Sequence, residues 1–82
     1  MGERRYGRFQ IPLDLIEQHP AAIRAVMGEV IVLRAEALIA AHAIEYEAVC
    51  PDFDIVAHGE AMPTYDVIFE ADTHKVVWVK QG

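Results

Sequence analysis

The chain has 82 residues, 54% of them hydrophobic, and its 13 acidic and 7 basic side chains give a formal net charge of -6 at pH 7. This length supplies one compact core and no more, and the high apolar fraction predicts surface left over for self-association. The single cysteine, Cys50, excludes an intramolecular disulfide framework and a cysteine-based zinc site, and no stretch reaches the roughly 20 apolar residues of a membrane span.

The N-terminal residues 1–10 combine two glycines with three arginines and show no periodic pattern. We therefore expect an irregular arm with a mobile tip, followed by one small α+β domain over residues 11–82. Polar residues interrupt the apolar ones after the arginines, which argues against a signal peptide.

Two short helices are predicted next. Pro12 suits the first turn of a helix that runs to His19, because a proline there loses no hydrogen bond. Pro20 ends this helix and can begin another, and Gly28 is placed to stop the second one. The second helix would bury one face, formed by Ile23, Val26 and Met27.

The central residues 30–53 hold most of the apolar side chains that could form a shared core, and residues 33–49 fit two structures. Their alanines favour a long helix. Their alternation also fits a β-hairpin in which every inward pair is apolar. That hairpin would pair Ile39 with Ile44, Ala37 with Tyr46, Ala35 with Ala48 and Leu33 with Cys50, with Arg34 near Glu47 and Glu36. Propensity favours the helix, whereas the register favours the hairpin.

The C-terminal third predicts a turn, a loop and a second hairpin. Phe53 is expected to fold back onto the core after Pro51, and the Gly and Pro of residues 55–63 predict a loop. Residues 64–71 and 74–80 then form a hairpin with Phe69 opposite Val76, Val67 opposite Trp78, Tyr65 opposite Lys80 and Glu70 opposite Lys75. The predicted fold is thus α+β, with short N-terminal helices packed on an antiparallel sheet of about four strands in two hairpins.

The outer face of this second hairpin is more apolar than a solvated sheet face requires. Either the helical segment or a second subunit is expected to cover it. The candidate self-association residues are Ile68, Val77 and Val79.

Several short motifs occur in a fixed order along the chain. They are Arg34-Ala35-Glu36, Ile44-Glu45-Tyr46-x-Ala48, Pro51-x-Phe53-Asp54-x-Val56, a loop at Gly59, and Pro63-x-Tyr65-x-Val67-x-Phe69. Over roughly residues 20–80 this order resembles a group of small proteins from phage and prophage genomes. The resemblance implies strands in the central stretch and a setting in the cytoplasm of a bacterial host cell. The group commonly has Ser where this chain has Cys50, which argues against essential thiol chemistry.

No set of residues predicts catalysis, a metal or a cofactor. His58-x-Glu60 lacks the cysteine half of a zinc deaminase site, and Asp52-x-Asp54 lacks the further oxygen ligands of a calcium loop. An inward-facing Cys50 would be inert. Arginines of the N-terminal arm could contact nucleic acid, but three charges beside an acidic body argue against direct binding.

Acidic residues dominate the second half of the chain. No Lys or Arg occurs between Arg34 and Lys75, and a surface of this sign favours basic protein partners. The competing interpretation is a solvated face that keeps a hydrophobic protein in solution. The candidate partner-binding residues are Glu36, Glu45, Glu47, Asp52, Asp54 and Glu60.

Three function hypotheses follow. The first is a non-enzymatic phage accessory protein that inhibits or modulates a host protein through its acidic surface, as anti-defence proteins such as anti-CRISPR proteins do. The second is a self-assembling structural module, either a homodimer or a virion component. The third, a minor enzyme or nucleic-acid binder, has no motif to support it.

Overall fold

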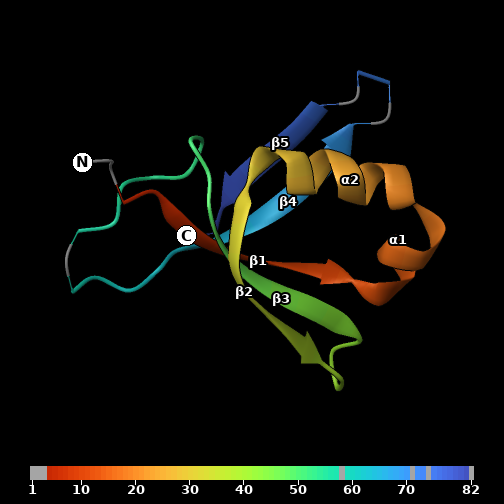
Figure 1. The fold of residues 1–82 in the computed structure, drawn as a ribbon, viewed down its shortest axis with the longest axis horizontal. Coiled ribbons are helices and arrows are strands. Elements are labelled where there is room, and N and C mark those ends of the chain that lie inside the picture. The colour runs from red at the N-terminus through yellow and green to blue at the C-terminus, as the bar shows by residue number, and fades with distance from the viewer. Residues whose placement is uncertain (1–3, 58, 71, 74, 82) are drawn as a thin grey trace.

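A computed structural model describes residues 4–57, 59–70, 72–73 and 75–81. These residues fold into five strands and two short helices, arranged as in Figure 1. The elements are β1 (Tyr6–Pro12), α1 (Leu13–Gln18), α2 (Pro20–Glu29), β2 (Ile31–Leu38), β3 (Ala43–Val49), β4 (Thr64–Glu70) and β5 (Lys75–Lys80). The strands form one sheet in the order β2-β3-β1-β4-β5. The class is α+β, as the sequence predicts.

The centre of the sheet is β1, and this corrects the prediction of an irregular arm for residues 6–10, while residues 1–3 of that arm lie outside the described residues. Gly7, Phe9 and Ile11 are buried while the residues between them are more exposed, which is the alternation of a half-buried strand. β1 pairs antiparallel with β3 and parallel with β4. The prediction of about four antiparallel strands therefore misses one strand and the parallel pairing, because the arm itself joins the two hairpins.

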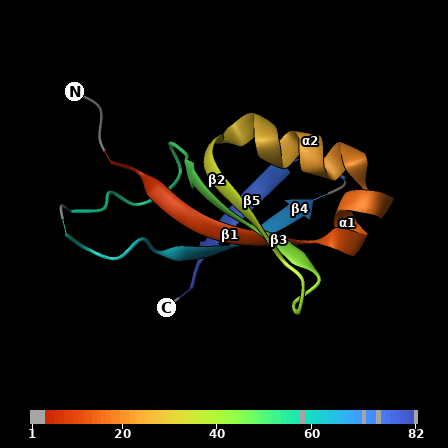
Figure 2. The same ribbon diagram turned by 60° about the horizontal axis from the view of Figure 1, so that its bottom comes forward.

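Both helices lie on one side of the sheet (Figure 2). The break at His19 and the start at Pro20 agree with the sequence, but α2 continues through Gly28 to Glu29. Ala22 and Val26 of α2 are buried, and Ile23 and Met27 pack against the same cluster. The helices thus cover the inner face of the sheet.

The central stretch is the predicted hairpin and not a helix. Its turn comes one residue earlier than expected, so Ala37 lies opposite Ile44 and Ala35 opposite Tyr46. The predicted register is therefore wrong by two residues, although the alanines keep their predicted face. An irregularity between Val32 and Arg34 leaves Leu33 without an opposite residue in β3, which is the geometry of a β-bulge.

The last hairpin agrees with the sequence at every described pair. Phe69 lies opposite Val76, Val67 opposite Trp78, Tyr65 opposite Lys80 and Glu70 opposite Lys75. Asp72 and Thr73 lie in the turn, while Ala71 and His74 are outside the described residues. The loop expected over residues 55–63 is free of helix and strand at its described positions.

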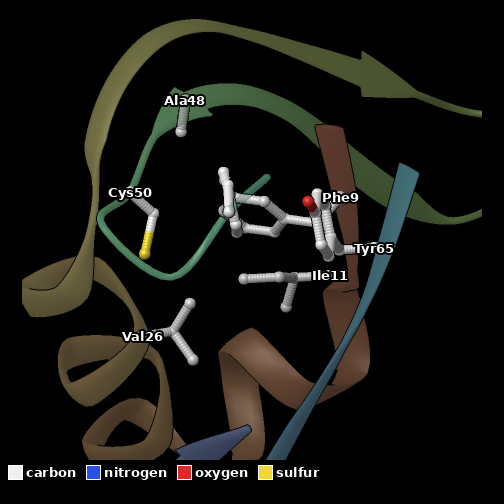
Figure 3. Close-up of a cluster of buried hydrophobic side chains, with 7 residues drawn as sticks. Phe9, Ile11, Val26, Ala48, Cys50 and Tyr65 are labelled. Carbon is white, nitrogen blue, oxygen red and sulfur yellow. The ribbon is translucent and has the colours of Figure 1, made fainter. Parts of the chain in front are cut away.

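The core lies between β1, the Cys50–Phe53 turn and α2 (Figure 3). Phe53 folds back as predicted and is fully buried, stacking on Tyr65 with ring centroids 4.4 Å apart. Gly7 makes this stacking possible, because a Cβ atom there would stand 2.6 Å from the Phe53 ring. The aromatic cluster therefore packs directly on the backbone of β1.

Candidate protein-interaction surface

The outer face of the sheet is the side that neither helix covers. Strand alternation places there the side chains of β1, β2 and β3 that are opposite in phase to the core residues. They are Arg8 and Gln10 of β1, Arg34 and Glu36 of β2, and Glu45 and Glu47 of β3. We call these six residues the charged face. Three of the six predicted partner-binding residues thus lie together, in adjacent positions of two strands.

One row of the charged face alternates in sign across three strands. Glu47 lies opposite Arg8 on one side and opposite Arg34 on the other. Its Oε2 atom is 3.1 Å from Nη2 of Arg8 and 3.9 Å from Nη1 of Arg34. The predicted proximity of Arg34 to Glu47 and Glu36 is confirmed, since Nη2 of Arg34 is 3.5 Å from Oε1 of Glu36.

The neighbouring row does not alternate in sign. Glu45 lies between Gln10 and Glu36, so two carboxylates face each other across β2 and β3. Like charges directly opposite on one sheet face are destabilising. Nε of Arg8 lies 3.9 Å from Oε1 of Glu45 and so offsets part of this repulsion. The Glu36 side chain remains 54% exposed.

The other predicted partner-binding residues lie in the segment that follows β3. Asp54 accepts a hydrogen bond from Nζ of Lys80 at 3.0 Å, and this bond raises the pKa of Lys80. Glu60 accepts one from the backbone N–H of Ala57 at 2.9 Å. Asp52 is exposed in the turn. Figure 1 shows this segment extending away from the tip of the β2–β3 hairpin. The six acidic residues therefore form two groups and not one surface.

The predicted self-association residues also lie on the outer face, on β4 and β5. Ile68 is directly opposite Val77, and Val79 is opposite Asp66. Ile68, Val77 and Val79 are 48%, 36% and 44% exposed. The helices pack on the inner face, so the expectation that the helical segment covers these residues is not met.

Sequence reasoning missed two features of this surface. The prediction places Arg8 in the arm, and the one sequence signal for a strand there is the alternation of Arg8 and Gln10 with Phe9 and Ile11, which runs across the predicted boundary after residue 10. The exposure of β2 was also missed, and every residue from Ile31 to Ala37 is exposed. Because β2 carries apolar side chains on both faces, its sequence pattern predicts a buried strand and does not reveal this exposure.

Cys50 lies in the core and not at a reactive site. It is fully buried, and burial raises the pKa of its thiol. A pocket of about 470 Å³ lies beside it, between the end of α2, the start of β2 and Pro51. Arg5 and Glu29 also line this pocket, and the negative charge of Glu29 adds to burial in raising the pKa of the thiol.

The structure suggests no metal site in the residues it describes. No group of three His, Cys, Asp or Glu side chains among them is arranged to hold a metal ion. His58 of the His58-x-Glu60 motif lies outside the described residues.

Comparison of the chain with protein-family models, curated proteins and solved structures finds no match. Neither α1 nor α2, the helices of the described part of the chain, has the length and apolar character needed to cross a membrane.

Proposed function

We propose that this chain is a non-enzymatic protein-binding module, a phage or prophage accessory protein that acts in the cytoplasm of a bacterial host. Its acidic residues bind a basic surface of a host protein and inhibit or modulate that protein, as an anti-defence or anti-CRISPR protein does. The observation that carries this proposal is the charged face, which no helix covers and which has three carboxylates against two arginines.

The geometry favours binding over catalysis. The charged face is built from side chains of three adjacent strands, and its ion pairs with Arg8 hold Glu45 and Glu47 in place. Side chains ordered in this way lose little entropy when a partner binds. Exposed charges at an interface contribute mainly to the association rate and to partner selection, and salt screens them.

The test is affinity purification of the tagged protein from a bacterial lysate at low salt. We expect a basic protein to be recovered and to dissociate as the salt concentration rises. The double variant Glu45→Gln with Glu47→Gln, both on the charged face, should lose it. The control Glu17→Gln with Asp72→Asn removes the same charge from α1 and the β4–β5 turn, and it should retain the partner. Equal recovery by both variants, or no salt-sensitive partner, contradicts the proposal.

A second candidate function is a self-assembling structural module, a homodimer or virion component. It is favoured by Ile68, Val77 and Val79, which form an exposed apolar patch across β4 and β5. Val77→Lys should then convert an associated species into a monomer in sedimentation velocity. A wild-type protein that remains monomeric at high concentration would remove this candidate.

A further inference from the structure

The second half of β2 is an open edge of the sheet. β2 pairs only with β3 among the described strands and is last in the strand order. Its other side therefore presents backbone N–H and C=O groups that can pair with another strand. Arg34–Leu38, the part beyond the bulge, lies in the hairpin that projects away from β4 and β5 (Figure 1).

We propose that two copies of this chain pair antiparallel through β2 about a two-fold axis at Ala35, which joins their five-stranded sheets into one. In this register Arg34 of each copy lies opposite Glu36 of the other. The contact is isologous, since one surface meets itself and every pair occurs twice.

Charge complementarity selects this register. Opposed side chains must share a face, so a symmetric antiparallel register can change only by centring the axis on another residue. Centring it on Arg34 would place two arginines opposite each other, and centring it on Glu36 would place two glutamates there. Only the axis at Ala35 creates two Arg–Glu pairs between the copies.

The same register offsets the repulsion between Glu36 and Glu45, the like-charge pair of the charged face. Glu36 faces Glu45 across β3, and nothing of opposite sign stands on its other side in its own row. Pairing places Arg34 of the second copy there. The row then reads Gln10, Glu45, Glu36, and in the second copy Arg34, Glu47, Arg8, so that each Glu36 gains a cation as its cross-strand neighbour.

Apolar residues flank these charged pairs. Leu33, 57% exposed, comes opposite Ala37 of the second copy, and Ile39, 88% exposed, lies just beyond the paired stretch. The bulge at Leu33 limits the regular seam to a few residues, so we expect a dimer in exchange with the monomer. This seam is separate from the patch of Ile68, Val77 and Val79 on β4 and β5, and it does not depend on the proposed host partner.

Complementary charge variants test the register. Arg34→Glu places two glutamates opposite each other, and Glu36→Arg places two arginines opposite each other, so each variant alone should be monomeric. An equimolar mixture should restore both opposite-charge pairs and form a heterodimer. Sedimentation velocity with one variant fluorescently labelled measures this, with wild type as the positive control.

The Glu36→Arg variant separates pairing from folding. Inside one chain the introduced arginine gains Glu45 as its cross-strand neighbour but loses the exposed ion pair with Arg34, so in dilute solution the variant should unfold close to wild type while losing the dimer. A wild type that stays monomeric at millimolar concentration overturns the proposal, as does a mixture that remains monomeric.

Cysteine crosslinking tests the axis itself. Opposed residues in antiparallel strands have Cα atoms about 4.5–5.5 Å apart, within the range of a disulfide. Ala35→Cys should therefore form a disulfide-linked dimer under mild oxidation. Ala37→Cys is the matched control on the same strand and face, and its two copies would lie roughly 13 Å apart. Equal crosslinking of both variants contradicts a two-fold axis at Ala35.

Discussion

Strands β1 and β2 have similar lengths but opposite environments, and the more apolar of the two, β2, is the exposed one. In β1, Phe9 and Ile11 are fully buried, whereas in β2 the side chains of Ile31 and Leu33 are 69% and 57% exposed. The difference comes from position, because β1 lies at the centre of the sheet under the Phe53 turn and β2 at its edge. Burial stabilises the fold at β1, and exposure leaves β2 available for contacts with other molecules.

The largest expected effect in this comparison is at Phe53, the residue that covers β1. Phe53→Ala should lower the free energy of unfolding by about 3–5 kcal/mol, because it removes a fully buried ring that stacks on Tyr65. Ile39→Ala, next to β2, should change it by less than about 0.5 kcal/mol. Urea denaturation measures both variants.

If Phe53→Ala does not fold, Phe53→Leu provides the milder comparison and should still cost more than Ile39→Ala. If the variants at Phe53 and Ile39 lost similar amounts of unfolding free energy, the proposed difference between a stabilising β1 and an exposed β2 would be contradicted.

The next effect concerns the backbone of β1 at Gly7. Gly7→Ala should destabilise the protein by about 1–3 kcal/mol, because the new methyl group would meet ring atoms of Phe53 and Tyr65 at 2.6–2.8 Å. Gly28→Ala is the matched control. A Cβ atom at Gly28 would have open space in α2, so that variant should gain about 0.5–1 kcal/mol. Thermal unfolding of the two variants distinguishes the expected loss of stability from the expected gain. A Gly7→Ala variant as stable as wild type would mean that the rings do not rest on β1.

The smallest effect concerns Cys50, whose backbone N–H donates to Arg5 just before β1. Burial raises the pKa of the thiol above its value in the unfolded chain, so the folded state keeps the proton to higher pH. The contribution of the protonated thiol to the free energy of unfolding should therefore be fully present below the unfolded thiol pKa of about 8.5. Above that pH the free energy of unfolding should fall, by at most about 1.4 kcal/mol per pH unit.

Denaturation at pH 7 and pH 9.5 checks this expectation, with Cys50→Ala as the control that lacks the titrating group. An equal loss of stability in both proteins would exclude the thiol as its cause.

The sequence predicts local pairing better than the arrangement of the sheet. The alternation of Val67 and Phe69 against Val76 and Trp78 determines the last hairpin, because a short turn leaves one apolar register. The central hairpin is predicted two residues out of register, since Ala35 and Ala37 pair acceptably in either position. The place of β1 depends on contacts with β3 and β4 far along the chain, which no local pattern contains.

The candidate surface is likewise predicted only in its composition and not in its arrangement. Its acidic residues are evident from composition, but Glu47 lies between Arg8 and Arg34 only because β1 enters the sheet beside β3. The separation of Asp54 and Glu60 from the charged face likewise follows from the path of the chain after Cys50. Charge counts predict the sign of a surface, whereas the sheet order decides which charges meet.

Amide hydrogen exchange at two protein concentrations tests most directly whether β1 stabilises the fold while β2 is its open, self-pairing edge. In dilute solution we expect slow exchange in β1 and fast exchange at the alternate β2 amides that point away from β3. At millimolar concentration those β2 amides should become protected while β1 is unchanged. Outward β2 amides that are as slow as β1 when dilute, or that stay fast when concentrated, would contradict the account.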